Sequence, residues 1–149
     1  MGEKAPPGKR TPASRQGPLS MATFLLDTSV IIDTINDKRG RRLYLRGLLE
    51  AGNLLACCAI SVAEIYAGMR PKEEEDTERF LTALEYYPIP FTTARLAGAL
   101  KRDYRKKGAT LSLADTLIAA VALDYHLTLI TDNVKDFPMP ELVLHRLPE

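Results

Sequence analysis

The sequence predicts an α/β fold, a three-layer α/β/α arrangement around a mostly parallel central sheet. Short apolar segments typical of buried strands alternate along the chain with longer segments of helical spacing. Strands separated by helices favour parallel pairing, with helices on both faces of the sheet. With 149 residues, 46% of them hydrophobic and 26% charged, the chain has the size and composition of one globular domain.

The first half of the chain predicts two strands and three helices. Residues 23–26 form a short apolar run that ends at Asp27, and helical spacing follows it. Four leucines over 43–49 predict a second helix over 41–50, and Gly52 and Asn53 stop it. The apolar run 54–60 predicts a buried strand, and Ser61 is expected to open the next helix.

The second half continues the alternation. Helical spacing and apolar runs predict helices over 73–86, 93–107 and 112–125, and strands over 127–131 and 142–147. The first of these helices has an acidic start, and Pro88 and Pro90 end it. Gly108 closes the second. No internal repeat or second domain is expected.

The first twenty residues predict a disordered leader, with a single folded domain over 21–149. They are rich in proline, glycine, serine and basic residues, and they lack the apolar core of a secretory signal. The leader holds four of the 20 basic and one of the 19 acidic residues, so the domain has 16 basic and 18 acidic residues and a net charge of −2. A generally basic nucleic-acid-binding surface is therefore not expected.

The apolar residues and the cysteines favour a cytoplasmic protein. No apolar run approaches the roughly 20 residues that span a bilayer, so we expect no membrane association. Cys57 and Cys58 are neighbours in a predicted strand, which directs them to opposite faces of the sheet. They are expected to be small core residues in a reducing compartment.

Four acidic residues stand where a strand ends or a helix begins: Asp27, Glu64, Asp115 and Asp132. In an open parallel sheet, residues just beyond the carboxyl ends of the strands gather in one crevice, and ligands bind there. Carboxylates gathered in this way suit a hard divalent cation. The sequence therefore predicts an acidic metal site at this edge of the sheet.

Each acid also has a simpler structural interpretation. Ser61 and Ser112 each precede an acid by three residues, as in a helix capping box. Asp27 fits the N-cap of the helix that begins near Thr28, and Asp132 fits the start of a turn. Taken singly, each acid is more often a cap. Their shared position at strand and helix ends favours one common site.

Four motifs, in order, resemble those of the PIN-domain ribonucleases, and in particular the VapC-type toxins of toxin–antitoxin pairs: LLDTSVIID, SVAEIYAGMR, LADTLIAAVAL and LITDNVKDF. The resemblance covers nearly all of residues 23–149. It implies a three-layer α/β fold and an RNA endonuclease that depends on Mg²⁺ or Mn²⁺. It also implies an RNA substrate, a homodimer and inhibition by a cognate antitoxin protein.

By this resemblance, Asp27, Glu64 and Asp115 match the family's three most regular acids. Three polar residues match supporting positions of the motifs: Ser29, Thr131 and Asn133. Asp132 and Asp136 compete for the fourth acid, and Asp132 is favoured because it lies nearer the strand end. Asp27 and Asp115 are expected to bind the metal directly, with Glu64 and Asp132 binding directly or through water.

RNA must bring phosphates near an acidic pocket, so basic residues are expected beside it. Two basic clusters stand near the first and third acidic motifs, and the residues selected from them as possible RNA contacts are Arg41, Arg42, Arg102 and Arg105. A solvated helix face is the commoner explanation of any one charge cluster.

Two other function classes stay open. The first is a non-catalytic PIN-like module that binds RNA or protein without cutting, and the three intact acids argue against it. The second is another Mg²⁺-dependent α/β phosphoesterase. A haloacid-dehalogenase-like phosphatase would need a second aspartate two positions after Asp27, where Ser29 stands.

Overall fold

The computed structural model describes residues 21–149, so the leader predicted over 1–20 lies outside the described residues. The strands are β1 (Thr23–Leu26), β2 (Leu54–Cys58), β3 (Glu85–Tyr87), β4 (Thr128–Thr131) and β5 (Val143–Arg146). The α-helices are α1 (Thr28–Ile35), α2 (Arg41–Glu50), α3 (Ala59–Gly68), α4 (Glu74–Thr82), α5 (Phe91–Lys106) and α6 (Leu113–Asp124). The described part of the chain also has two short 3-10 helices, η2 (Pro71–Glu73) and η3 (Val134–Asp136).

The five strands of residues 21–149 form one parallel sheet in the order β3-β2-β1-β4-β5. β1 is therefore central, and its four residues are all buried. The carboxyl ends of β1, β2 and β4 lie side by side at one edge of the sheet, which is the edge where the acidic motifs begin.

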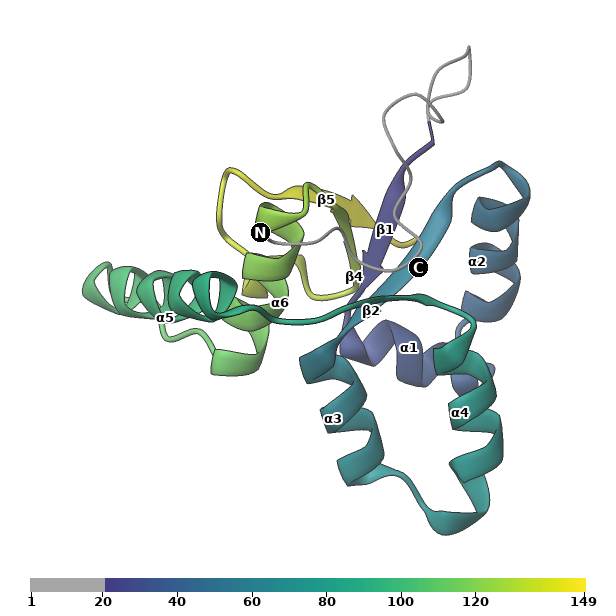
Figure 1. Cartoon of the computed structure of the whole chain (residues 1–149). Helices are drawn as coiled ribbons and strands as arrows, with labels where there is room; N and C mark the ends of the chain where they lie inside the picture. The colour runs from purple at the N-terminus through teal and green to yellow at the C-terminus, as the bar shows by residue number, and fades with distance from the viewer. Residues whose placement is uncertain (1–20) are drawn as a thin grey trace.

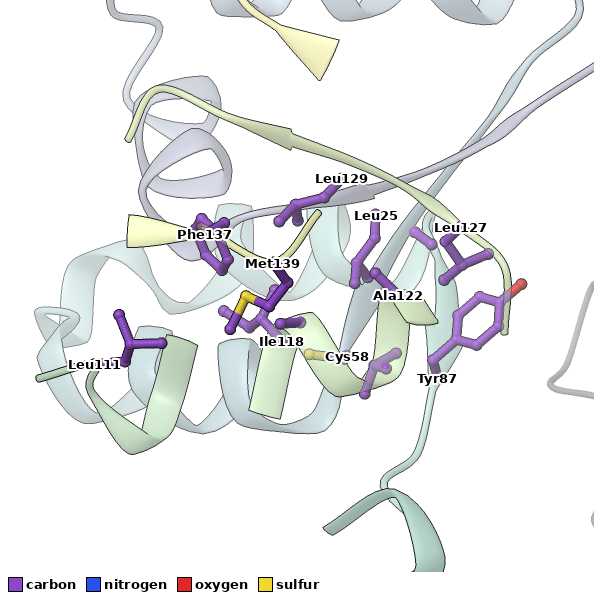
Figure 2. Packing of buried hydrophobic residues seen from close by; sticks show 13 residues of the cluster. Leu25, Cys58, Tyr87, Leu111, Ile118, Ala122, Leu127, Leu129, Phe137 and Met139 are labelled. Carbon is purple, nitrogen blue, oxygen red and sulfur yellow. The ribbon is translucent and has the colours of Figure 1, made fainter. Parts of the chain in front are cut away.

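Apolar side chains pack on both faces of the sheet. Neighbouring strand residues alternate between the faces: Leu25 and Cys58 belong to one core cluster, and Leu26 and Cys57 to the other. Helices α5 and α6 cover the first face, and α1, α2 and α4 cover the second (Figure 1). Figure 2 shows the first cluster, with Ile118 of α6 packed among strand side chains. The predicted three-layer fold and the predicted burial of both cysteines are confirmed.

The predicted helix over 73–86 is partly wrong. The α-helix ends at Thr82, and Glu85–Tyr87 forms the edge strand β3, in which Tyr87 pairs with Cys58 of β2. The tyrosine pair suits a strand, and the following prolines end it. The pairing buries Tyr87 almost completely.

The start of α3 also differs from the prediction. The helix begins at Ala59, and Cys58 occupies its N-cap, so Ser61 lies inside the first turn and does not cap it. The other predicted elements agree with the structure to within about two residues, and α2 agrees at both ends. Within residues 21–149, no helix combines the length and apolar character needed to cross a membrane.

Candidate functional site

Asp27 occupies the central position of the site, directly after β1. Its backbone N–H donates to the Ile130 carbonyl of β4 at 3.0 Å, which fixes the residue between the two strands. Its Oδ1 accepts from the Thr28 N–H at 2.8 Å and caps α1, and its Oδ2 accepts from the Thr131 hydroxyl at 2.7 Å. Only 5% of Asp27 is exposed. The predicted cap is therefore present, and it also orients a carboxylate toward the site.

Glu64 reaches the same place from α3. The Thr28 hydroxyl donates to Glu64 Oε1 at 2.7 Å, and it lies 2.8 Å from the Ser61 hydroxyl. Because a hydroxyl has a single proton, Thr28 accepts from Ser61 while it donates to Glu64. The sequence prediction missed this role of Thr28 and Ser61. The available signal was that Thr28 directly follows Asp27, and that Ser61 precedes Glu64 by three residues in the same motif.

Asp115 lies in the first turn of α6. The Ser112 hydroxyl accepts from the Asp115 N–H at 3.0 Å, which confirms the predicted N-cap. The cap fixes the start of the helix, and the Asp115 side chain is partly exposed at the pocket.

These three acids line one surface pocket of about 350 Å³, together with Thr28, Ser29, Ile32 and Asn133. Thr131 is fully buried behind it and holds Asp27. The Ser29 hydroxyl is also buried, and it has no hydrogen-bond partner among residues 21–149. The structure thus gathers six of the predicted site residues: Asp27, Ser29, Glu64, Asp115, Thr131 and Asn133.

Burial and the nearby charges disfavour the ionised forms of Asp27 and Asp115. Burial raises the pKa of Asp27, and the nearby charges of Asp115 and Glu64 raise it further, against the hydrogen bonds from Thr131 and Thr28. Burial also raises the pKa of Asp115, and the charges of Asp136 and Glu64 act in the same direction. A bound cation would relieve this repulsion.

Asp132 lies outside this pocket. Its Oδ1 is 2.6 Å from Arg41 Nη2 and its Oδ2 is 3.1 Å from Arg39 Nη1. Thr131 faces Asp27, and the next side chain along the chain points the other way, toward the connection between α1 and α2. The structure therefore does not bring Asp132 to the acids, contrary to the sequence prediction. The charge that acts on Asp115 from this segment is that of Asp136.

The predicted RNA-binding arginines occupy different environments. Arg41 is 1% exposed and cannot meet a phosphate, so that prediction is wrong; its side chain points inward to Asp132. Arg42 donates to the carbonyls of Thr34 and Ile35 at the end of α1, and its side chain is exposed. The other two lie on the exposed surface of α5 and stay predictions: Arg102 and Arg105.

The donor set suits a hard divalent cation. Carboxylates, hydroxyls and an amide line the pocket, and such oxygen ligands are those that Mg²⁺ and related ions prefer. In the part of the chain that the structure describes, no three acidic, histidine or cysteine side chains already converge as a metal-binding group. Mg²⁺ commonly binds through one or two carboxylates and keeps several waters, so these residues fit such an ion.

A PIN-domain model matches residues 24–138. Ribonuclease VapC10 of Mycobacterium tuberculosis is 36% identical over 118 residues, which cover 79% of this chain and 88% of the relative. Ribonuclease VapC19 of the same organism is 32% identical over 119 residues, with 79% and 95% covered. The chain therefore belongs to the PIN-domain family, in the group that includes the VapC ribonucleases.

Solved structures agree with this assignment. VapBC2 from Rickettsia felis, bound to a DNA fragment from its promoter, has a TM-score of 0.75 at 26% identity and covers 85% of this chain and 99% of that one. A toxin–antitoxin complex from Klebsiella pneumoniae has a TM-score of 0.62 at 30% identity, with 80% and 94% covered. PIN-domain ribonucleases generally depend on a divalent metal.

Proposed function

We propose that this protein is a divalent-metal-dependent endoribonuclease, which hydrolyses RNA phosphodiester bonds as the toxin of a VapBC-type pair. The observation that carries the proposal is the common pocket of Asp27, Glu64 and Asp115, which come from three separate segments of the chain. The relatives named Ribonuclease VapC support the reaction, and the structures solved as toxin–antitoxin complexes support a cognate antitoxin as partner.

The ion is Mg²⁺ or Mn²⁺ in this proposal. Asp27 and Asp115 are its principal direct ligands, and Glu64 binds directly or through water. Asp136 replaces Asp132 as the candidate for the fourth acid, because both oxygens of Asp132 lie beside arginines, whereas the charge of Asp136 acts to raise the pKa of Asp115. When bound, such an ion lowers the pKa of an attacking water and stabilises charge on the leaving oxygen.

The protein's own groups hold the reacting parts in place. Thr131 and the Thr28 N–H fix the two oxygens of Asp27 in separate directions. The Thr28 hydroxyl fixes Glu64. Ser29 and Asn133 line the pocket without belonging to the carboxylate set, and we assign them to the orientation of the scissile phosphate.

RNA cleavage by antitoxin-free protein tests this function. Total RNA is incubated with the wild type, with Asp27→Asn and with Asp103→Asn, in Mg²⁺, Mn²⁺ or EDTA, and the new ends are mapped. Asp103 is an exposed aspartate of α5 that does not line the pocket, so its variant is the matched control. We expect cleavage by the wild type and the control with metal, and none by Asp27→Asn or in EDTA.

Cleavage that survives both chelation and Asp27→Asn would contradict the metal-nuclease proposal. RNA that is bound but left intact by the metal-loaded wild type would favour the non-catalytic module. The homodimer implied by the family resemblance is a separate proposal, and analytical ultracentrifugation of the antitoxin-free protein tests it.

A further inference from the structure

A buried ion pair lies next to the acidic pocket and takes no part in it. Arg41 Nη2 is 2.6 Å from Asp132 Oδ1, with 1% of the arginine side chain and 13% of the aspartate side chain exposed. Buried ion pairs add little net stability, because the desolvation of both charges offsets their attraction. Such a pair is better explained by the conformation that it fixes in the segments it joins.

The Arg41 guanidinium joins its own segment to two segments that are distant in sequence. Besides Asp132 after β4, its Nη1 donates to the carbonyl of Arg39 at 3.2 Å and to that of Pro148, beyond β5, at 3.0 Å. The connection between α1 and α2 has positive φ at Asp37 and Arg39, 55° and 58°. Non-glycine residues in that region are strained and persist only where their surroundings hold them.

The neighbours of Asp132 on both sides belong to the site. The Thr131 hydroxyl donates to Asp27 Oδ2 at 2.7 Å and accepts from the Asn133 N–H at 2.9 Å, and Asn133 lines the pocket. The conformation of the turn 131–133 therefore sets the direction of the Asp27 carboxylate and the place of Asn133. Asp132 anchors that turn from its other side.

We propose that Asp132 is a positioning residue: its ion pairs with Arg41 and Arg39 fix the turn 131–133, and through Thr131 they fix the orientation of the Asp27 carboxylate. The proposal rests on the metal-dependent function proposed above. A metal ligand at position 132 would present its carboxylate to the pocket, whereas each oxygen of Asp132 lies within 3.1 Å of an arginine nitrogen.

Mn²⁺ binding without RNA tests this role, measured by titration calorimetry on folded protein. The variants are Asp132→Asn, Arg41→Gln and their double, with Arg79→Gln as control, because Arg79 is an exposed arginine of α4 that pairs with acids far from the pocket. We expect each single variant to bind Mn²⁺ about 10-fold more weakly, the size found for groups that orient metal ligands. The double variant should be no weaker than the singles, because both act through one contact.

The sign of the Arg41→Gln effect separates the alternatives. Removing a positive charge beside an acidic pocket strengthens cation binding by electrostatics alone, whereas loss of positioning weakens it. Weaker binding by Asp132→Asn together with tighter binding by Arg41→Gln would make Asp132 a ligand and overturn the proposal. Unchanged affinity in both folded variants would reduce the pair to a stabilising contact and overturn it as well.

A substitute variant and the wild-type protein complete the test. If Arg41→Gln does not fold, Arg39→Gln replaces it, since that side chain is 52% exposed; we expect a smaller loss in the same direction, and unchanged affinity would overturn the proposal. Wild-type protein that binds Mn²⁺ but cuts no RNA would contradict the nuclease function alone. Wild-type protein that binds no Mn²⁺ would overturn both.

Discussion

The two oxygens of Asp27 have separate hydrogen-bond donors, and this division explains how one residue can cap a helix and serve a site. Oδ1 receives the first N–H of α1, and Oδ2 receives the Thr131 hydroxyl. Charge-assisted bonds of this kind favour the ionised form, whereas burial and the neighbouring acids oppose it. The carboxylate is thus held in one orientation, but its ionised form is unfavourable. Both properties are expected of a group that binds a cation.

The raised pKa values of Asp27 and Asp115 predict an unusual pH dependence. In the unfolded chain both groups ionise at lower pH than in the folded protein. Their contribution to stability is therefore fully present below the ordinary aspartate pKa and is lost as pH rises through the raised values. In EDTA, Asp27→Asn should melt above the wild type, and the difference should grow from about pH 4 toward neutrality.

Calorimetry or circular dichroism checks this expectation. Each kcal/mol of relieved repulsion raises the melting temperature by about 2–4 °C in a domain of this size. Saturating Mg²⁺ or Mn²⁺ should stabilise the wild type more than Asp27→Asn. A wild-type melting temperature indifferent to metal, with a difference from the variant that does not change with pH, would argue against a repulsive cluster.

At the scale of elements, β3 shows how pairing with a distant strand overrides local preference. The acidic segment before it has helical spacing, and three strand residues are too few to show an alternating pattern. The strand exists because its backbone pairs with β2 and because Tyr87 packs against Tyr125, with ring centroids 4.9 Å apart. Neither contact is visible from the local sequence.

Two adjacent tyrosines of β3 allow a matched test of this account. Tyr87 is 1% exposed and Tyr86 41%. We expect Tyr87→Ala to lower the free energy of unfolding by about 3–5 kcal/mol, as buried aromatic truncations do. Tyr86→Ala should cost less than about 1 kcal/mol. Urea denaturation measures both, and equal losses would show that side-chain burial in the core is not what fixes the strand.

At the scale of the whole molecule, the alternation of apolar strands and amphipathic helices was sufficient to predict a three-layer fold. Parallel topology then placed Asp27 and Glu64 near one edge, because strand ends can be located in a sequence, and Asp115 joins them from the start of α6. The place of Asp132 could not be predicted in this way. Its partner Arg41 lies 91 residues away, and the direction of a side chain at a strand end depends on register.

The two cysteines are buried, one on each face of the sheet, and the native protein should therefore not react with thiol reagents. Cys57 and Cys58 are both buried, and burial raises the pKa of the Cys57 thiol to about 12, so almost no reactive thiolate is present at neutral pH. Ellman's reagent should react with neither until the protein unfolds. Since these are the chain's only two cysteines, a cysteine introduced in place of exposed Asp103, which does not line the pocket, would carry a fluorophore alone. The natural sequence is thus a ready background for following the approach of RNA or antitoxin by single-site labelling.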